Sequence, residues 1–170
     1  MYVNALGTSL PEKRYTKGDC WEAFTASEWF GRLEPRSRAM AKLVLTRANG
    51  IDERWLSVDS LDEVFAIDPE TLHRRFASHA PRLAAAAGAA ALRRAALTPE
   101  AIDAVIVTTC TGYLCPGLTS YVAEQLGLRS NALLQDLVDL SRFRPALTQP
   151  CSDVVLNTAG ASDRVQIGFD

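Results

Sequence analysis

The run AVIVTT at residues 104–109 constrains the fold of this chain more than any other segment. Its residues are apolar or β-branched without alternation, which is typical of a strand buried on both faces of a parallel sheet. A loop with two cysteines, CTGYLCPG at 110–117, follows it directly. The segment therefore predicts a layered α/β fold, with this loop at the carboxyl end of a strand, where such sheets bind ligands.

Helices and strands alternate around this strand. Residues 117–126 predict a helix that Gly127 ends, and NALLQDLV at 131–138 predicts the next strand. Residues 69–97 predict a long helix, which we expect Pro81 to kink or restart. Strand, helix and strand joined by short connections favour an α/β fold with a mostly parallel sheet and helices on its faces.

The N-terminal part of the chain predicts further elements. The aromatic residues Trp21, Phe24 and Trp29 are expected to lie on the buried side of a helix that ends at Gly31. A second helix carries the apolar stripe Met40, Leu43 and Val44. The expected ranges are a strand at 1–7, helices at 16–33 and 36–48, and a strand at 51–58.

The tract LAAAAGAAALRRAAL at 83–97 has two interpretations. Alanine and glycine around a helix allow neighbouring backbones to approach closely, as in a helix packed inside a layered fold. Alternatively, the tract is a low-complexity run of good helix formers with no special contact.

Composition narrows the class of protein. The chain has 170 residues, 48% hydrophobic and 22% charged, which is usual for a soluble globular protein with one core. The net charge of -2 gives no general attraction to nucleic acid or to an anionic membrane. The N-terminal residues lack a secretory signal pattern, and no apolar run is long enough to span a bilayer. We expect a cytoplasmic protein.

The four cysteines do not indicate a disulfide framework or a metal site. Cys20 and Cys151 are far from the loop pair, so there is no second close pair for zinc, and no CxxC redox spacing occurs. His73 and His79 fall within a helical pattern and are expected to be solvated or to cap a helix. We therefore predict reduced thiols and no metal.

The segment TTCTGYLCPGLTSYVAEQLGLRSNALLQDLV at 108–138 resembles the type III polyketide synthases, the chalcone-synthase-like family, and especially its bacterial members within the thiolase superfamily. GTSLPEKRYT, NGIDERWLSVD and DPETLHRRFASHAP extend the likeness over residues 1–138. The resemblance implies the N-terminal βαβαβ half of a thiolase-like fold in 1–138, incomplete by itself, followed by a divergent tail in 139–170. Decarboxylating ketoacyl synthases share this fold but not the Gly-Tyr-Leu-Cys-Pro-Gly run.

The family condenses a starter acyl-CoA with malonyl-CoA by decarboxylative Claisen condensation on a cysteine, without any cofactor other than these CoA substrates. The resemblance implies that the loop lines the substrate pocket and that Cys115 reaches a homodimer partner. Alternatively, the loop cysteines pack as small apolar groups. The implied pocket residues are Cys110, Thr111, Gly112, Cys115, Pro116 and Gly117.

The resemblance also implies a basic site for the phosphates of coenzyme A. The segment RSRAMAKLVLTR places Arg38, Lys42 and Arg47 in the matching region, with Arg38 and Lys42 one helical turn apart. The alternative is a solvated helix face.

The sequence departs from the family pattern after Val138. Asp139 and Ser141 stand where the family has the glycines of its Gly-x-Gly-Cys turn, and Arg142 falls at the nucleophile position. Arginine forms no thioester, and Cys151 lies in no comparable turn. The family histidine and asparagine come from a second half without a counterpart here. Such an abrupt loss is typical of a frameshift or a truncation, so we expect a chain that is inactive alone.

Two other functions remain open. The chain is either a non-catalytic binding or dimerisation module, pairing with itself or with a full-length synthase, or a ketoacyl-synthase-like acyltransferase acting through Cys110 or Cys151. Half of a two-lobed fold exposes apolar surface and a sheet edge, which predicts poor solubility or obligate association.

Overall fold

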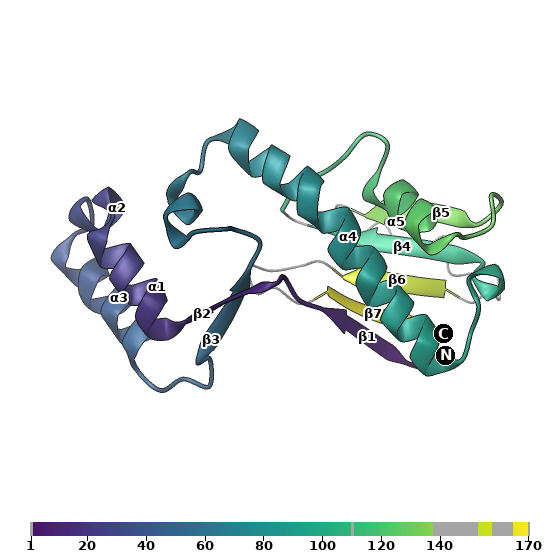
Figure 1. The fold of residues 1–170 in the computed structure, drawn as a ribbon, viewed down its shortest axis with the longest axis horizontal. Coiled ribbons are helices and arrows are strands. Elements are labelled where there is room, and N and C mark those ends of the chain that lie inside the picture. The colour runs from purple at the N-terminus through teal and green to yellow at the C-terminus, as the bar shows by residue number, and fades with distance from the viewer. Residues whose placement is uncertain (1, 110, 138–152, 158–164, 170) are drawn as a thin grey trace. The chain divides into compact units, whose positions relative to one another are not determined.

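The computed structural model describes residues 2–109, 111–137, 153–157 and 165–169 of the chain. These residues form two compact units, one from Met1–Leu10 with His73–Asp170 and the other from Pro11–Leu72. Figure 1 shows their helices and strands. No helix within the described ranges is long and apolar enough to cross a membrane.

The first unit is built on a mixed five-stranded sheet in the order β1-β7-β6-β4-β5. β4 pairs in parallel with both β5 and β6, whereas β7 is antiparallel to both β6 and β1. Four of these strands therefore run in one direction and only β7 opposes them, so the prediction of a mostly parallel sheet is confirmed. The bounds are β1 Leu6–Ser9, β4 Ala104–Thr108, β5 Leu133–Leu137, β6 Asp153–Asn157 and β7 Val165–Phe169.

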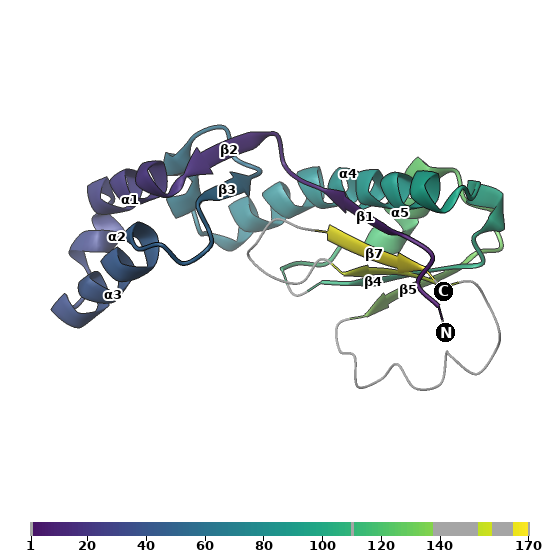
Figure 2. The ribbon, with the colours of Figure 1, turned by 90° about the horizontal axis from the view of Figure 1, so that it is seen from below.

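The core of this unit lies between β4 and two helices, α4 (Pro69–Ala95) and α5 (Leu118–Leu126). Val105 and Val107 of β4 belong to the cluster that these helices complete, and Ile106 between them is also buried. The prediction of a strand buried on both faces is thus confirmed. Figure 2 shows α4 along one side of the sheet. The helical members of the cluster are Phe76, Ala84, Ala87, Ala91 and Leu92 from α4, and Leu118 and Val122 from α5.

β1 approaches the backbone of α4 very closely at Gly7. A Cβ atom at this glycine would lie 2.2 Å from the Ala87 carbonyl oxygen and 2.5 Å from the Ala91 nitrogen. Ala87 and Ala91 are fully buried, so any larger side chain there would separate the strand from the helix. This contact favours the first interpretation of the alanine-rich tract, a helix selected for close packing.

Pro81 does not divide α4. The helix runs from Pro69 to Ala95 with Pro81 buried inside it, so the expected restart does not occur. The end of α5 is as predicted, because Gly127 adopts a left-handed conformation with φ 68° and donates its N–H to the helix carbonyls.

The second unit holds three helices beside a two-stranded antiparallel sheet. Phe30 packs edge-on against both Trp21 and Phe24, with ring centroids 5.6 Å apart in each pair, and Phe24 stacks on Phe65. The predicted helix at 16–33 is split at Ser27, and β2 was not predicted. The bounds are β2 Lys13–Thr16, α1 Lys17–Ala26, α2 Glu28–Gly31, α3 Pro35–Thr46, β3 Glu53–Leu56 and the 3₁₀ helix η1 Leu61–Phe65.

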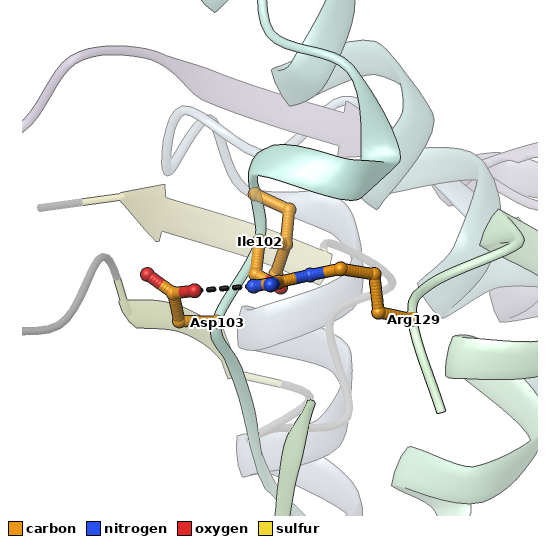
Figure 3. A network of polar contacts seen from close by, with 3 residues as sticks. All are labelled: Ile102, Asp103 and Arg129. Carbon is orange, nitrogen blue, oxygen red and sulfur yellow. Dashed lines mark hydrogen bonds and ion pairs between the residues drawn. The ribbon is translucent and has the colours of Figure 1, made fainter. Parts of the chain in front are cut away.

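Hydrogen bonds and an ion pair fix the amino end of β4, which follows the 3₁₀ turn η2 (Pro99–Ala101). The Arg129 guanidinium donates to the Ile102 carbonyl oxygen at 3.3 Å and pairs with the Asp103 carboxylate (Figure 3). The Leu133 N–H donates to the Asp103 carbonyl oxygen at 2.8 Å. These bonds fix the start of β5 beside the start of β4.

Replacing Gly7 tests the close approach of β1 to α4. We expect Gly7→Ala to lower the free energy of unfolding by about 1–3 kcal/mol, since the added methyl group overlaps the Ala87 carbonyl. Gly18→Ala is the matched control, because its Cβ would lie 3.5 Å from the nearest atom and alanine favours the helix by up to about 1 kcal/mol. Urea unfolding of both variants checks this, and equal stability of Gly7→Ala and the wild type would contradict it.

Candidate functional site

The loop between β4 and α5 lies at the carboxyl end of the central strand. Thr109 continues from the strand, and its hydroxyl accepts a hydrogen bond from the Thr111 N–H at 3.2 Å. Residues 111–117 are described, whereas Cys110 lies outside the described residues. The structure therefore brings five of the six predicted pocket residues together in one short loop.

The first part of the loop rests on an aromatic ring of α4. A Cβ atom at Gly112 would lie 2.9 Å from two ring carbons of Phe76. Phe76 is buried in the core, so its ring has little room to move away. Glycine is required at this position because the backbone passes directly over the ring.

The middle of the loop presents its side chains to solvent, while Leu114 packs against the core. Tyr113 is 75% exposed, and Thr111 is exposed as well. Cys115 is an exposed free thiol, followed by the exposed Pro116 across a cis peptide bond. The alternative that Cys115 packs as a buried apolar group is therefore wrong.

The end of the loop is held by a carboxylate from β5. Asp136 accepts hydrogen bonds from both the backbone N–H of Thr119, at 3.1 Å, and the Thr119 hydroxyl, at 2.7 Å. Gly117 is the N-cap residue of α5 and makes no side-chain cap bond, so Asp136 supplies the cap from another element. Asp136 was not predicted from the sequence. The available signal was an acidic residue near the end of the next expected strand.

The predicted basic residues lie on and after α3, in the second unit. Arg38 donates to the Gly31 carbonyl oxygen at 2.6 Å, and its guanidinium lies 5.5 Å from the Phe30 ring centroid. Lys42 is exposed one helical turn further along. Arg47 is the C-cap residue, and its carbonyl oxygen accepts a hydrogen bond from the Lys17 ammonium.

The remaining titratable candidates are dispersed. His73 is exposed on α4, and the His79 ring contacts the Arg82 guanidinium at 3.3 Å. Burial raises the pKa of the Cys20 thiol above its usual value. Within the described ranges, no three side chains of His, Cys, Asp or Glu gather as a metal site. Arg142 and Cys151 lie outside the described residues.

Replacing Gly112 tests the contact of the loop with Phe76. We expect Gly112→Ala to lower the free energy of unfolding by about 1–3 kcal/mol, because the methyl group overlaps the ring. Gly31→Ala, where no atom lies within 4 Å of the added Cβ, should cost little. In a Phe76→Leu background the cost of Gly112→Ala should fall, and a cost unchanged in urea unfolding would contradict the contact.

Comparison with known proteins gives a sequence relative and several matching folds. No family model matches the chain. Pks18 from Mycobacterium tuberculosis, described as an alpha-pyrone synthesis polyketide synthase-like protein, is 29% identical over 132 residues, which cover 74% of this chain and 32% of the relative. The protein of the same name from Mycobacterium bovis matches equally. The chain thus spans about a third of the length of these relatives.

Solved structures of type III polyketide synthases share the fold. The fungal enzyme ORAS matches with a TM-score of 0.73 and 22% identity over 98% of this chain and 54% of that one. PKS-I from the brown alga Ectocarpus siliculosus matches with a TM-score of 0.78 and 14% identity, covering 98% and 55%. 1,3,6,8-Tetrahydroxynaphthalene synthase from Streptomyces coelicolor matches with 0.71 and 17%, covering 100% and 56%. Sequence and fold together show that this chain is similar to type III polyketide synthases and that it carries about half of their thiolase-like fold.

Proposed function

We propose that this chain is the N-terminal portion of a type III polyketide synthase and that it binds acyl-CoA thioesters. The loop at 111–117, in the first unit, is the candidate surface for the acyl group. The basic residues on and after α3, in the second unit, are a separate candidate surface for phosphates and are tested independently of the loop. Coenzyme A esters are substrates here, and no metal or other cofactor is invoked. The observation that carries the proposal is the loop itself, which rests on the buried Phe76 at Gly112 and is held by Asp136 at its end, while its middle faces solvent.

The loop has the properties of a binding surface. Gly112 rests on Phe76, and the start of α5 is held by Asp136, so the backbone between them is ordered before any ligand arrives. An ordered loop loses less conformational entropy on binding than a mobile one. Its position at the carboxyl end of β4 is the usual ligand position in α/β sheets.

The positive charge of α3 supports a contact with the phosphates of coenzyme A. All residues of this candidate contact belong to the second unit. Four basic residues and no acidic residue occur between Pro35 and Arg47. Arg38 is engaged with Gly31 and Phe30, so its removal would also disturb α2. Lys42 is exposed and is the better test of charge alone.

Binding and condensation are separable in this proposal. In the ungapped comparison with the family pattern, Arg142 stands at the nucleophile position, and a guanidinium cannot accept an acyl group. We therefore infer that the chain by itself binds the thioester without forming an acyl-enzyme. Condensation needs a thiolate that residues 139–142 do not contain.

Lys42→Ala tests the phosphate contact. We expect the dissociation constant for coenzyme A to rise about fivefold at low salt, equivalent to about 1 kcal/mol, and the difference to shrink as salt rises. Arg93→Ala, which removes an exposed cation from the last turn of α4, is the control. Isothermal titration calorimetry measures both. An unchanged affinity in Lys42→Ala, or an equal loss in Arg93→Ala, would count against the proposed site.

A dimerisation module is the second candidate, and the edge of the sheet favours it. Of the described strands, only β4 pairs with β5, so β5 is an edge strand. Leu133 is 49% exposed and Leu134 is 38% exposed on that edge. An apolar edge with unpaired backbone groups favours pairing with a second copy of the same strand, related by a twofold axis.

Leu133→Lys tests this pairing. A charge on the edge should shift the chain from dimer to monomer in size-exclusion chromatography with light scattering. Leu72→Lys is the matched control, because Leu72 is similarly exposed, at 45%, and belongs to the second unit, which does not contain β5. A wild-type chain that is monomeric at all concentrations tested would refute the dimer.

A further inference from the structure

Asp136, Gly117 and Thr119 form one interlocked contact at the end of the loop. Both carboxylate oxygens of Asp136 are used, one by the Thr119 N–H and the other by the Thr119 hydroxyl. The contact joins residues that are 17 positions apart in sequence and belong to different elements. A strand residue therefore fixes where α5 begins.

Gly117 is required by this carboxylate rather than by its own backbone conformation. Its φ of -59° is accessible to any residue. A Cβ atom there would lie 1.8 Å from Asp136 Oδ2 and 2.7 Å from the carboxyl carbon. The missing side chain at the N-cap is the space that the carboxylate occupies.

The sheet register places Asp136 correctly for this role. Asp136 lies beside Val107 in the parallel ladder of β4 and β5, so both side chains point to the face of the sheet that α5 covers. Asp136 is the residue before the last of β5, near the carboxyl ends of both strands. The Asp136 side chain thus links β5 to the start of α5, where the loop at 111–117 ends.

We propose that Asp136 is a positioning residue for the acyl-binding loop, and that its contact with Thr119 determines which acyl chain lengths the loop accepts. The inference rests on the proposed function, because it names what governs acyl selectivity at that site. The loop is then held at two points, on Phe76 at Gly112 and on Asp136 at Gly117. Releasing the second point lets residues 113–116 shift relative to β4 and changes the space for the acyl chain.

The test measures binding of coenzyme A, acetyl-CoA, hexanoyl-CoA and dodecanoyl-CoA by calorimetry to the wild type and to Asp136→Ala. We expect the ratio of dissociation constants between the long and short acyl-CoAs to change by at least about threefold, which is roughly 0.7 kcal/mol. Affinity for coenzyme A itself should not change. Asp136→Asn should restore the wild-type ratio, because an amide can accept from the Thr119 N–H and donate to its hydroxyl.

Asp103→Ala is the matched control, since it removes the ion pair between the Asp103 carboxylate and Arg129 at the opposite end of the same sheet (Figure 3). It should lower stability without changing the acyl ratio. Gly117→Ala should change the ratio in the wild type but not further in an Asp136→Ala background, where the clash is gone. Hydrogen exchange at the Thr119 amide should be faster in Asp136→Ala and unchanged in Asp103→Ala.

The outcomes separate this inference from the proposed function. A wild type that binds none of the acyl-CoAs overturns the proposed function and this inference with it. A wild type that binds them, with the same acyl ratio in Asp136→Ala despite faster exchange at Thr119, overturns only the inference and leaves Asp136 a helix cap. A changed ratio in Asp103→Ala as well would show a general loss of stability and would also overturn it.

Discussion

The burial of β4 on both faces governs the arrangement of the first unit. With Val105 and Val107 packed against two helices and Ile106 buried on the opposite face, the strand has to lie inside the sheet rather than at its edge. Its neighbours and its direction then follow from short connections to α4 and α5. The loop at 111–117 follows the carboxyl end of this strand and therefore lies where α/β sheets bind ligands.

Three glycines of the first unit are required because another group occupies the space that a side chain would need. None of the three has a left-handed backbone conformation. At Gly7 the space is taken by the α4 backbone, at Gly112 by the Phe76 ring and at Gly117 by the Asp136 carboxylate. Each contact would be broken by one methyl group, so the strand, the helix and the loop are held at mutually fixed distances. Gly127 differs, since its left-handed φ is what ends α5.

Elements with a strong local pattern could be predicted from the sequence, and long-range contacts could not. β4, β5, α4 and α5 all follow from apolar runs, helix periodicity and glycine at a helix end. β2 was missed because KRYT has no apolar alternation and forms only by pairing with β3. The loop residues 111–117 were predicted as a group, whereas Asp136 was missed because its role depends on strand register.

Substrate binding and condensation make different physical demands, and this chain meets them unequally in its described part. Binding needs an ordered surface, which the contacts at Gly112 and Asp136 supply. Condensation needs a thiolate beside donors aimed at a developing oxyanion, whereas the sequence after β5 reads DLSR at 139–142. Under the proposed function these two demands separate, because the described loop can hold an acyl-CoA while residues 139–142 contain no thiol to which its acyl group could be transferred.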